Sequence, residues 1–439
     1  MKKHLHSILD EGYPFVLTVL AIAVMPLIPE YGAPVLAIFS VFTAHKDARA
    51  RGTELRIGVL GKLLLVYIAY MAIGILYSDH KGNSFATLLM WLVMFLVYVS
   101  LGTVLVTRKR IRIALGMVAV AAGLVGLVAC GQYLLRSVLG FSSLPNQFWY
   151  RFDRFFYNYF PMDIDLTLGD DRAAGTFNNP NILGEYLVMV IPLVGYYGFF
   201  GKRTKIHMLG RLCTILAVFG AVVSFSRGAY IALLSMLLLI VFMHARKISP
   251  FVMCLLAAVS LVPEAVIGRL FSIGQGGDAI FERFEAWEVA VQVIIKNPLF
   301  GLGPGVSNFW EQLTKMGVSA PHSHNLILQI LVEGGFIALF LMCLVATHLL
   351  QDSLGLLNRS NQSAPTGRIF LIFAVAFVVY GMVDYPFLSP KLIGIFCLVL
   401  GFFDCMSALY LPNRFTPLSK LLDPLIKYVK ALPKRLKKQ

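Results

Sequence analysis

Two histidines stand two residues apart in the stretch SAPHSHNLILQILVEGGFIAL, residues 319–339, directly before an apolar run. Imidazole exchanges a proton near neutral pH, so His324 could act as a general base on a bound substrate, with His322 and Asn325 as further candidate binding residues. Ser323 or Asn325 could instead cap a helix that begins here, in which case the histidines would be structural. The stretch alone leaves both interpretations open.

Two arginines stand where they could bind an anion. Arg227, in VVSFSRGAYIAL, lies between two apolar runs with almost no loop, and an arginine at a membrane boundary is costly unless it snorkels or is paired. Its rigid guanidinium fork suits phosphate, which makes it a candidate anion clamp. Arg283, in ERFEAWE, has the acidic neighbours Glu282 and Glu285, so on spacing alone an exposed ion pair explains it more simply.

A further cluster lies in DDRAAGTFNNPNILGEY, residues 170–186. Asn179 and Asn181 flank a proline at the start of an apolar run, and an asparagine before a helix can accept from its first N–H groups. Capping therefore accounts for Asn179 or Asn181. It does not account for Arg172 together with Glu185, which falls one turn inside the run, so all four remain candidate binding residues.

Membrane helices must position these residues. Of 439 residues, 58% are hydrophobic and 14% charged, whereas soluble domains carry about 25% charged residues. Apolar runs of about 17–25 residues, each long enough to cross a bilayer, recur along the chain. We predict an all-α polytopic membrane bundle of about twelve transmembrane helices, at 13–29, 31–45, 57–77, 85–107, 113–138, 181–200, 208–225, 228–244, 250–267, 325–350, 368–383 and 391–411.

The positive charge predicts an orientation. The net charge is +15, but the basic residues lie in short clusters such as TRKRIR and GKRTK between apolar runs, which favours membrane topology over nucleic-acid binding. The clusters fall in alternate connections, so we expect both termini in the cytoplasm and the N-terminal run retained as the first helix. Residues 1–411 would form one bundle, and residues 412–439 a basic cytoplasmic tail on the anionic inner leaflet.

Two long connections, about 140–180 and 268–324, should then lie in the periplasm. The first contains FWYRFDRFFYNYF, which is typical of an amphipathic helix on the outer leaflet, or of a loop packed on the bundle. The second predicts an amphipathic helix whose apolar face contains Ile280, Phe284, Trp287, Val291 and Ile294. A glycine-rich turn, GLGPG, follows it.

On this topology all the polar clusters face outward, at the lipid–water boundary and away from ATP. Arginines without an acidic metal-binding cluster suggest a phosphate ester that is bound directly. All six cysteines lie in apolar runs without a CxxC pair, so no metal or redox site is predicted. A sugar linked to a polyprenyl diphosphate fits, because the diphosphate is both handle and leaving group, and a histidine or glutamate could deprotonate the acceptor.

The segments RAAGTFNNPNILGEY, SFSRGAYIAL, RFEAWEVAVQVIIKNPLFGLGPG and HSHNLILQILVEGGF occur in this order between Arg172 and Phe336. Together they resemble the O-antigen ligase and polymerase superfamily of bacterial envelope glycosyltransferases. The family pattern of His, then Asn or Ser, nine residues and Gly is matched by His324, Asn325 and Gly335. Ala338 departs from the Gly, Thr or Tyr that is usual in ligases, which puts the choice of ligase over polymerase in doubt.

This resemblance implies a GT-C-like membrane bundle in the bacterial inner membrane with a periplasmic, metal-independent site and no cofactor. By position, Arg227 and Arg283 would bind the diphosphate of an undecaprenyl-diphosphate-linked glycan, and His324 would act at the acceptor, lipid A–core. A polymerase would use a second lipid-linked glycan as acceptor instead. Glycan transfer to a protein and a lipid-glycan transporter remain further alternatives. The partners expected are these lipid-linked glycans and membrane lipids, without nucleic acid.

Overall fold

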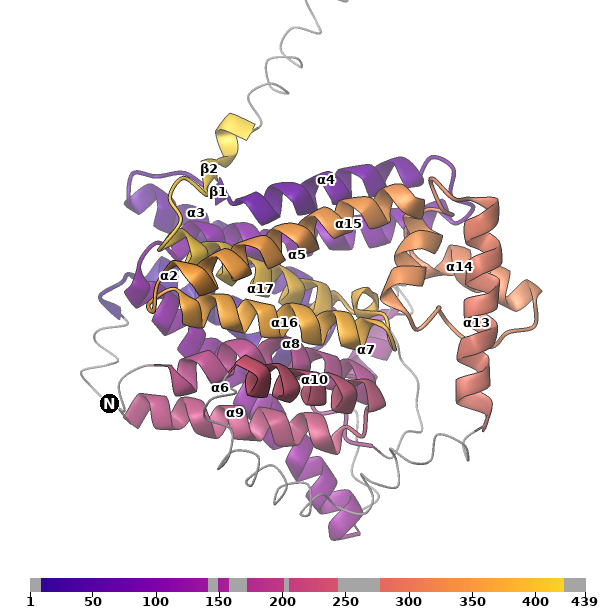
Figure 1. The fold of residues 1–439 in the computed structure, drawn as a ribbon, viewed down its shortest axis with the longest axis horizontal. Helices are drawn as coiled ribbons and strands as arrows, with labels where there is room; N and C mark the ends of the chain where they lie inside the picture. Colours follow the sequence, from indigo (N-terminus) through magenta and orange to yellow (C-terminus); the bar gives the residue numbers. More distant parts are fainter. Residues whose placement is uncertain (1–8, 141–148, 158–171, 201–204, 244–276, 422–439) are drawn as a thin grey trace, which may run out of the picture.

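The structure is a computed structural model, and it describes residues 9–140, 149–157, 172–200, 205–243 and 277–421. Long helices lie side by side across Figure 1, and one helix, α13, stands across their ends. The chain therefore presents two ends of a bundle. We call them the His324 end, where α15 begins, and the Arg110 end, where α6 begins.

The bundle helices begin and end within about five residues of the predicted bounds, except that α15 continues to Arg359, about nine residues beyond its predicted end. They are α2 (Tyr13–Val24), α3 (Gly32–Ala50), α4 (Val59–Gly74), α5 (Lys81–Val104), α6 (Arg108–Tyr133), α8 (Pro180–Phe199), α9 (Lys205–Val223), α10 (Arg227–Met243), α15 (Leu326–Arg359), α16 (Ala364–Gly381) and α17 (Pro390–Ala408). Every predicted helix on described residues is thus present. The helix predicted at 250–267 lies outside them.

Short elements complete the described chain. A 3-10 turn η1 (Met25–Leu27) follows α2, and a π turn η2 (Leu134–Val138) extends α6. The small helices α7 (Tyr150–Tyr157), α14 (Val306–Lys315) and η4 (Pro386–Leu388) lie with α13 (Gly277–Lys296) at the His324 end. At the Arg110 end, β1 (Arg56–Ile57) pairs antiparallel with β2 (Thr416–Pro417).

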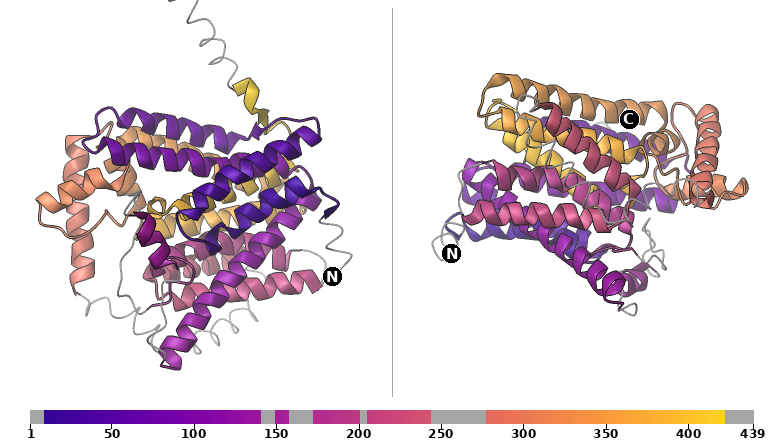
Figure 2. Two further views of the ribbon diagram at one scale, coloured as in Figure 1. Left: turned by 180° about the vertical axis from the view of Figure 1, so that it is seen from behind. Right: turned by 60° about the horizontal axis from the view of Figure 1, so that its bottom comes forward.

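Six of the described helices are long and apolar enough to cross a membrane, and four shorter apolar helices accompany them. The chain is therefore a polytopic membrane protein, while the number of spans stays a prediction. Helix α17 lies at the centre, packed against α5 and α8 (Figure 2), and nearly all of its residues are buried. Such a helix is apolar on all sides because other helices surround it.

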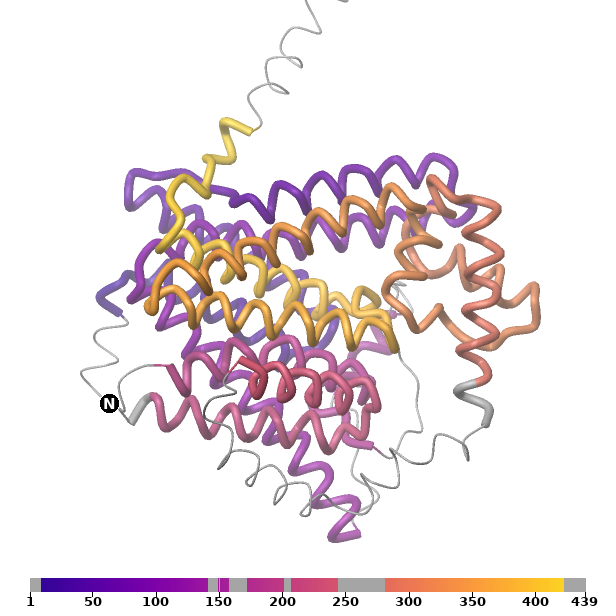
Figure 3. Tube along the Cα trace, in the orientation of Figure 1, coloured from indigo at the N-terminus to yellow at the C-terminus, as the bar shows by residue number. Residues whose placement is uncertain are grey.

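Helix α15 lies between α4 and α16 (Figure 3), and it carries the predicted histidine motif at its start. Its path bends where Gly335 has a φ of 65°. At that bend Phe336 N donates to Pro298 O over 2.8 Å, and a Cβ on Gly335 would lie 2.3 Å from the Leu299 backbone. Only glycine fits this close approach, which ties the segment after α13 to α15.

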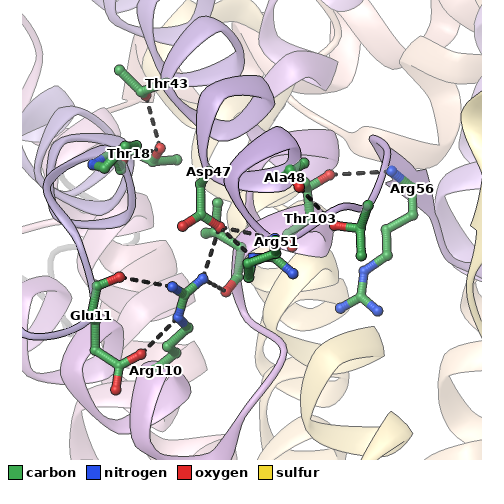
Figure 4. Close-up of polar contacts among 12 residues, drawn as sticks. Glu11, Thr18, Thr43, Asp47, Ala48, Arg51, Arg56, Thr103 and Arg110 are labelled. Carbon is green, nitrogen blue, oxygen red and sulfur yellow. Dashed lines mark hydrogen bonds and ion pairs between the residues drawn. The ribbon is translucent and has the colours of Figure 1, made fainter.

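An ion-pair network closes the Arg110 end (Figure 4). The Arg110 guanidinium donates to Glu11 Oε2 and to Asp47 Oδ2, both over 2.8 Å, and also to the Glu11 and Val104 carbonyls. Arg51 donates to the same Asp47 carboxylate over 2.9 Å. Because each buried charge has an opposite charge beside it, this network can hold α2, α3 and α6 together.

The first long connection contains the short helix α7, which packs on the bundle through one face. Asp153 is fully buried and accepts from Asn178 Nδ2 over 2.8 Å, and Trp149 Nε1 donates to Leu27 O over 3.0 Å. Phe152 and Phe155 stay exposed on the same helix. This part of the connection is therefore a helix that packs on the bundle through one face and keeps phenylalanine side chains exposed on another.

The apolar face predicted for α13 is wrong in part. Phe284 and Val291 are exposed, and the Ile280 side chain lies outside the described residues. The buried face instead carries Ala286, Val289, Ala290 and Val293, which pack with residues of α14 and α15. Small alanines let neighbouring helices approach closely, so they take the inner face while larger apolar side chains remain outside.

Candidate functional site

The start of α15 is held by polar side chains on both sides. Asn325 is its N-cap, with its side-chain oxygen accepting from Ile327 N and Leu328 N, while its Nδ2 donates to Met382 O over 3.1 Å. Asn325 therefore fixes the helix start and ties it to the end of α16. Both ends of its amide are thus engaged in structural contacts, and a role of Asn325 in substrate binding stays a prediction.

The residue before the histidine is anchored from two further helices. Ser323 O accepts from Trp287 Nε1 over 2.7 Å, and Ser323 N donates to Gln329 Oε1 over 3.1 Å. Gln329 in turn donates to Glu333 Oε1 over 2.9 Å. The backbone at the two histidines is thus clamped between α13 and α15.

His324 has a left-handed backbone conformation, with a φ of 47°. This region is uncommon for residues other than glycine, and a surrounding structure must hold it in place. The conformation brings His324 Nδ1 to 3.1 Å from Asp384 Oδ1, in the loop after α16. When Nδ1–H donates to this carboxylate, the lone pair is on Nε2, the atom able to take a proton.

His322 lies behind His324 and is buried. The backbone N–H of His324 donates to His322 Nδ1 over 3.0 Å, so Nδ1 must carry a lone pair and the proton of the neutral ring must be on Nε2. Burial lowers the pKa of His322 to about 3, and the charges of His324 and Arg283 lower it further while Asp384 opposes them. His322 is therefore neutral at physiological pH and supports the His324 backbone.

Asp384 remains ionised despite its burial. Burial raises its pKa, but the hydrogen bond from His324 and the positive charges nearby, including Arg283, hold it well below its usual range. An ionised carboxylate beside Nδ1 orients the imidazole and stabilises its protonated form.

Arg283, on α13, lies within electrostatic reach of both His322 and Asp384. It is half-buried, and none of the ion pairs between described residues includes it. The exposed pairing with Glu282 or Glu285 that its sequence neighbours suggested is therefore not seen. A guanidinium placed here can accept an anionic ligand beside the histidine.

The turn between α9 and α10 brings a second arginine to the same end. Only residues 224–226 separate the two helices, as the sequence predicted, and Arg227 is the first residue of α10. A Cβ on Gly228 would lie 2.8 Å from Val383 and 3.2 Å from Tyr380, so this turn packs directly against the loop that carries Asp384.

Arg172 joins the start of α8 to that turn. Its Nη1 donates to Asn181 Oδ1 over 3.2 Å and to the Phe225 carbonyl over 3.3 Å. Tyr380 Oη donates to Asn181 O over 2.7 Å. Asn179 is the N-cap of α8, with its side chain accepting from Asn181 N, so capping accounts for Asn179 as the sequence allowed.

Glu185 lies one turn inside α8 and is 3% exposed. Its Oε1 has no hydrogen-bond partner among the described residues, and its charge interacts with Asp384. Gly184, its neighbour, packs against Ser224 and Ser226 of the α9–α10 turn. Glu185 is thus buried beside the site, where a substrate hydroxyl could satisfy its oxygen.

The predicted residues from four separate stretches therefore meet at the His324 end. Residues 212–343 match the O-antigen ligase family, Wzy_C.

This matched segment covers less than a third of the chain and contains Arg227, Arg283, His322 and His324. The resemblance recognised from the sequence motifs is thereby confirmed for this range. A match to this family indicates an enzyme that transfers lipid-linked glycans. No curated protein matches the chain.

Two residues at the His324 end escaped the sequence analysis. Asp384 lies in DYPFLSPK, which showed only that its connection carries few charges, and Tyr380 lies within an apolar run. Both lie outside the matched segment. Their partners are about 60 and 200 residues away along the chain, a distance that no local pattern bridges.

Among the described residues, those that could hold a metal are His322, His324 and Asp384, whose potential ligand atoms lie within 4.8 Å of one another. Arg283 acts on the same group of atoms, and its positive charge opposes a cation there. His322 Nδ1 accepts from the His324 N–H, so the neutral ring carries its proton on Nε2, the nitrogen that lies 4.0 Å from Asp384. The arrangement suits a proton-transfer pair better than a metal centre.

Proposed function

We propose that the chain is an O-antigen ligase-like glycosyltransferase that moves a glycan from undecaprenyl diphosphate to lipid A–core at the periplasmic face of the bacterial inner membrane, without a metal. The observation that carries this proposal is the 3.1 Å contact between His324 Nδ1 and Asp384, beside Arg283. Imidazole, carboxylate and guanidinium together offer a base, a group that orients it, and a site for a diphosphate.

In this mechanism the arginines bind the donor. Arg283 on α13 and Arg227 on α10 contact the diphosphate, and Arg172 holds the turn next to Arg227 through Phe225 O. As the bond between the sugar anomeric carbon and the diphosphate oxygen breaks, negative charge grows on the leaving diphosphate. Fixed guanidinium groups stabilise that charge in the transition state, and they need no reorganisation to do so.

His324 acts on the acceptor. Its Nε2 takes the proton of an acceptor sugar hydroxyl while that oxygen forms the new bond to the anomeric carbon. Asp384 keeps the lone pair on Nε2 and stabilises the imidazolium that results. The products are the acceptor carrying the transferred glycan, the polyprenyl diphosphate and a proton on His324. General-base assistance of this kind contributes about 10²–10⁴-fold.

An apolar groove beside His324 could hold the polyprenyl chain of the donor. An apolar groove of about 420 Å³ runs between α15 and α16 and begins at Leu326 and Met382, two residues from His324 and Asp384 respectively. Its walls are almost entirely apolar, with Phe373 and Phe377 among them. A polyprenyl chain held here would place its diphosphate beside the histidine, which supports a lipid-linked substrate.

Polymerisation is the second candidate. Ala338 stands where ligases usually carry Gly, Thr or Tyr, and it is fully buried under Gly334, where an added Cβ would lie 2.4 Å from it. A polymerase would use the same donor chemistry with a second lipid-linked glycan as acceptor. The departure at Ala338 keeps this alternative open.

One experiment separates the two candidates. Purified protein in nanodiscs is incubated with a polyprenyl-diphosphate glycan and a chelator, with lipid A–core in one tube and without it in the other. We expect product only with lipid A–core. A ladder of longer lipid-linked glycans without it would show a polymerase. No product in either tube would contradict both and favour a protein acceptor, and activity that only added metal restores would refute the metal-free mechanism.

A further inference from the structure

A second groove lies far from the histidines, on the outside of the bundle. It is about 690 Å³ in volume and runs between α2, α6 and α9, with Tyr197 of α8 in its wall. Apart from its Arg110 end it is lined by apolar and small residues. Val120 and Leu124 of α6 remain exposed along it.

Three basic side chains stand at one end of this groove. Arg108, Lys109 and Arg112 line it at the first turn of α6, and all three are exposed. No acidic residue is among the described residues that line the groove. An apolar channel that ends in exposed positive charge has the polarity of an anionic lipid, with a tail region and a head region.

The ion-pair network beneath these three residues does not neutralise all of their charge. Glu11 pairs with Lys109 over 2.9 Å and with Arg110 over 2.8 Å, so its single charge is already shared. Arg108 lies over the Tyr410 ring at 5.3 Å, and the described residues give neither Arg108 nor Arg112 an acidic partner. The groove end therefore keeps an excess of positive charge.

The groove also supplies a neutral donor beside that charge. Tyr197 lies in its wall, with its hydroxyl 2.9 Å from the position that a Cβ on Gly116 would take. Arg112 acts electrostatically on this hydroxyl, which has no hydrogen-bond partner among the described residues. A hydroxyl and a guanidinium side by side can bind two oxygens of one phosphate.

The length of the groove suits an acyl chain. From Arg108 to Leu124 the α6 axis rises about 24 Å, while one leaflet contributes about half of a hydrocarbon core of about 30 Å. A chain that leaves a headgroup at Arg108 and Arg112 can follow the groove to the middle of the bilayer. The diphosphate site lies at the other end of the bundle, so this lipid would not be the substrate.

We propose that the groove between α2, α6 and α9 binds an anionic diacyl phospholipid, with its phosphate on Arg108, Lys109 and Arg112 and an acyl chain along α6. The lipid comes from the leaflet at the Arg110 end. It would fasten α2 and α9 to α6 and would be retained through purification. This proposal does not depend on the reaction at the His324 end.

Native mass spectrometry of delipidated protein tests it, with dioleoylphosphatidylglycerol and the zwitterionic dioleoylphosphatidylcholine titrated separately. We expect tighter binding of phosphatidylglycerol to the wild type. Each of Arg108→Gln and Arg112→Gln should weaken that binding about fivefold and leave phosphatidylcholine unaffected. The matched controls are Lys46→Gln and Arg359→Gln, exposed basic residues at the same end but outside the groove, and these should change nothing.

A second pair of variants tests the acyl chain without touching a charge. Val120→Trp fills the groove and should reduce retention of both lipids, whereas Val66→Trp, at a similarly exposed valine of α4, should not. Equal affinity of the wild type for the two lipids would overturn the proposal. So would losses in the control variants that equal those in the groove variants.

Discussion

Two histidine–aspartate pairs lie at opposite ends of α15, each with a nitrogen–oxygen distance of 3.1 Å. At one end His324 Nδ1 contacts Asp384, and at the other His348 Nε2 contacts Asp352. The second pair is closed by Arg414, which donates to His348 and to Asp352 and also to the buried Asp404. The first pair has Arg283 nearby, with no ion pair to a described residue.

The difference separates a structural cluster from a site that can receive a ligand. Where the arginine pairs directly with two aspartates and donates to the histidine, its charge is satisfied and the cluster fastens helices. Where the arginine reaches the pair only through space, an incoming anion can complete the arrangement. The same three residue types thus play two roles, and their connections decide which.

Arg414→Ala should have the largest effect on stability. The change leaves Asp404, which is fully buried, without its cation, and breaking such a pair costs about 3–5 kcal/mol. Transfer by the protein that remains folded should stay near the wild-type rate, because the site is at the other end of α15. Thermal unfolding in detergent, together with activity per folded molecule, measures both. Unchanged stability would show that this cluster does not fasten the fold.

Arg283→Ala should have the opposite pattern, with a large loss of activity and little loss of stability. Its guanidinium has no ion-pair partner among the described residues, so the unfolding free energy should change by less than about 0.5 kcal/mol. Removing a group that stabilises the leaving diphosphate should lower kcat/KM for the donor about 10²-fold. Arg283→Lys should recover only part of this, because an ammonium cannot contact two oxygens in one plane. Wild-type kinetics in the alanine variant would remove Arg283 from the donor site.

His322 should make stability depend on pH. Its pKa is about 6.5 in the unfolded chain and about 3 in the folded one, so between these values the unfolded state binds more protons. Stability should therefore fall as pH falls, by about 1.4 kcal/mol from pH 7.5 to 5.5. His322→Asn, whose side-chain oxygen can still accept from His324 N, should lose this dependence. Unfolding temperatures of the wild type and the variant, measured from pH 7.5 to 5.5, test this prediction. An equal fall in unfolding temperature with pH in the two proteins would argue against a neutral, buried His322.

Asn179→Ala should have the smallest effect of these variants, a modest loss of stability with no change in donor binding. Asn179 caps α8 by accepting from Asn181 N over 2.7 Å, and losing such a cap costs about 1 kcal/mol. The donor KM should not change, since the side chain of Asn179 serves as the helix cap. A shift in donor KM without a loss of stability would return Asn179 to the binding residues.

Much of the bundle follows from the sequence, because apolar runs and basic clusters are local patterns. The helix starts at Pro180, Arg227 and Leu326 agree with prediction within about two residues, and the tight α9–α10 turn was evident from its length. The inner face of α13 was not predicted correctly. Spacing of large apolar residues indicated Phe284 and Val291, whereas close packing favours Ala286 and Ala290.

The candidate site was predictable only in part for a similar reason. His324 and Arg227 belong to motifs whose residues stand close together in the chain. Asp384 gains its role from a contact made across 60 residues, which requires α15 and α16 to pack side by side. The distinction between His324 and His348 also depends on Arg414, which comes from the chain after α17.

Glycan transfer should depend on the open His324–Asp384 pair and not on the closed His348–Asp352 pair. The direct measurement compares single-turnover transfer by His324→Ala and His348→Ala proteins, purified in nanodiscs and matched for folded content. We expect a loss of about 10²–10⁴-fold in the first and a rate within about twofold of wild type in the second. Equal rates in the two variants would contradict it.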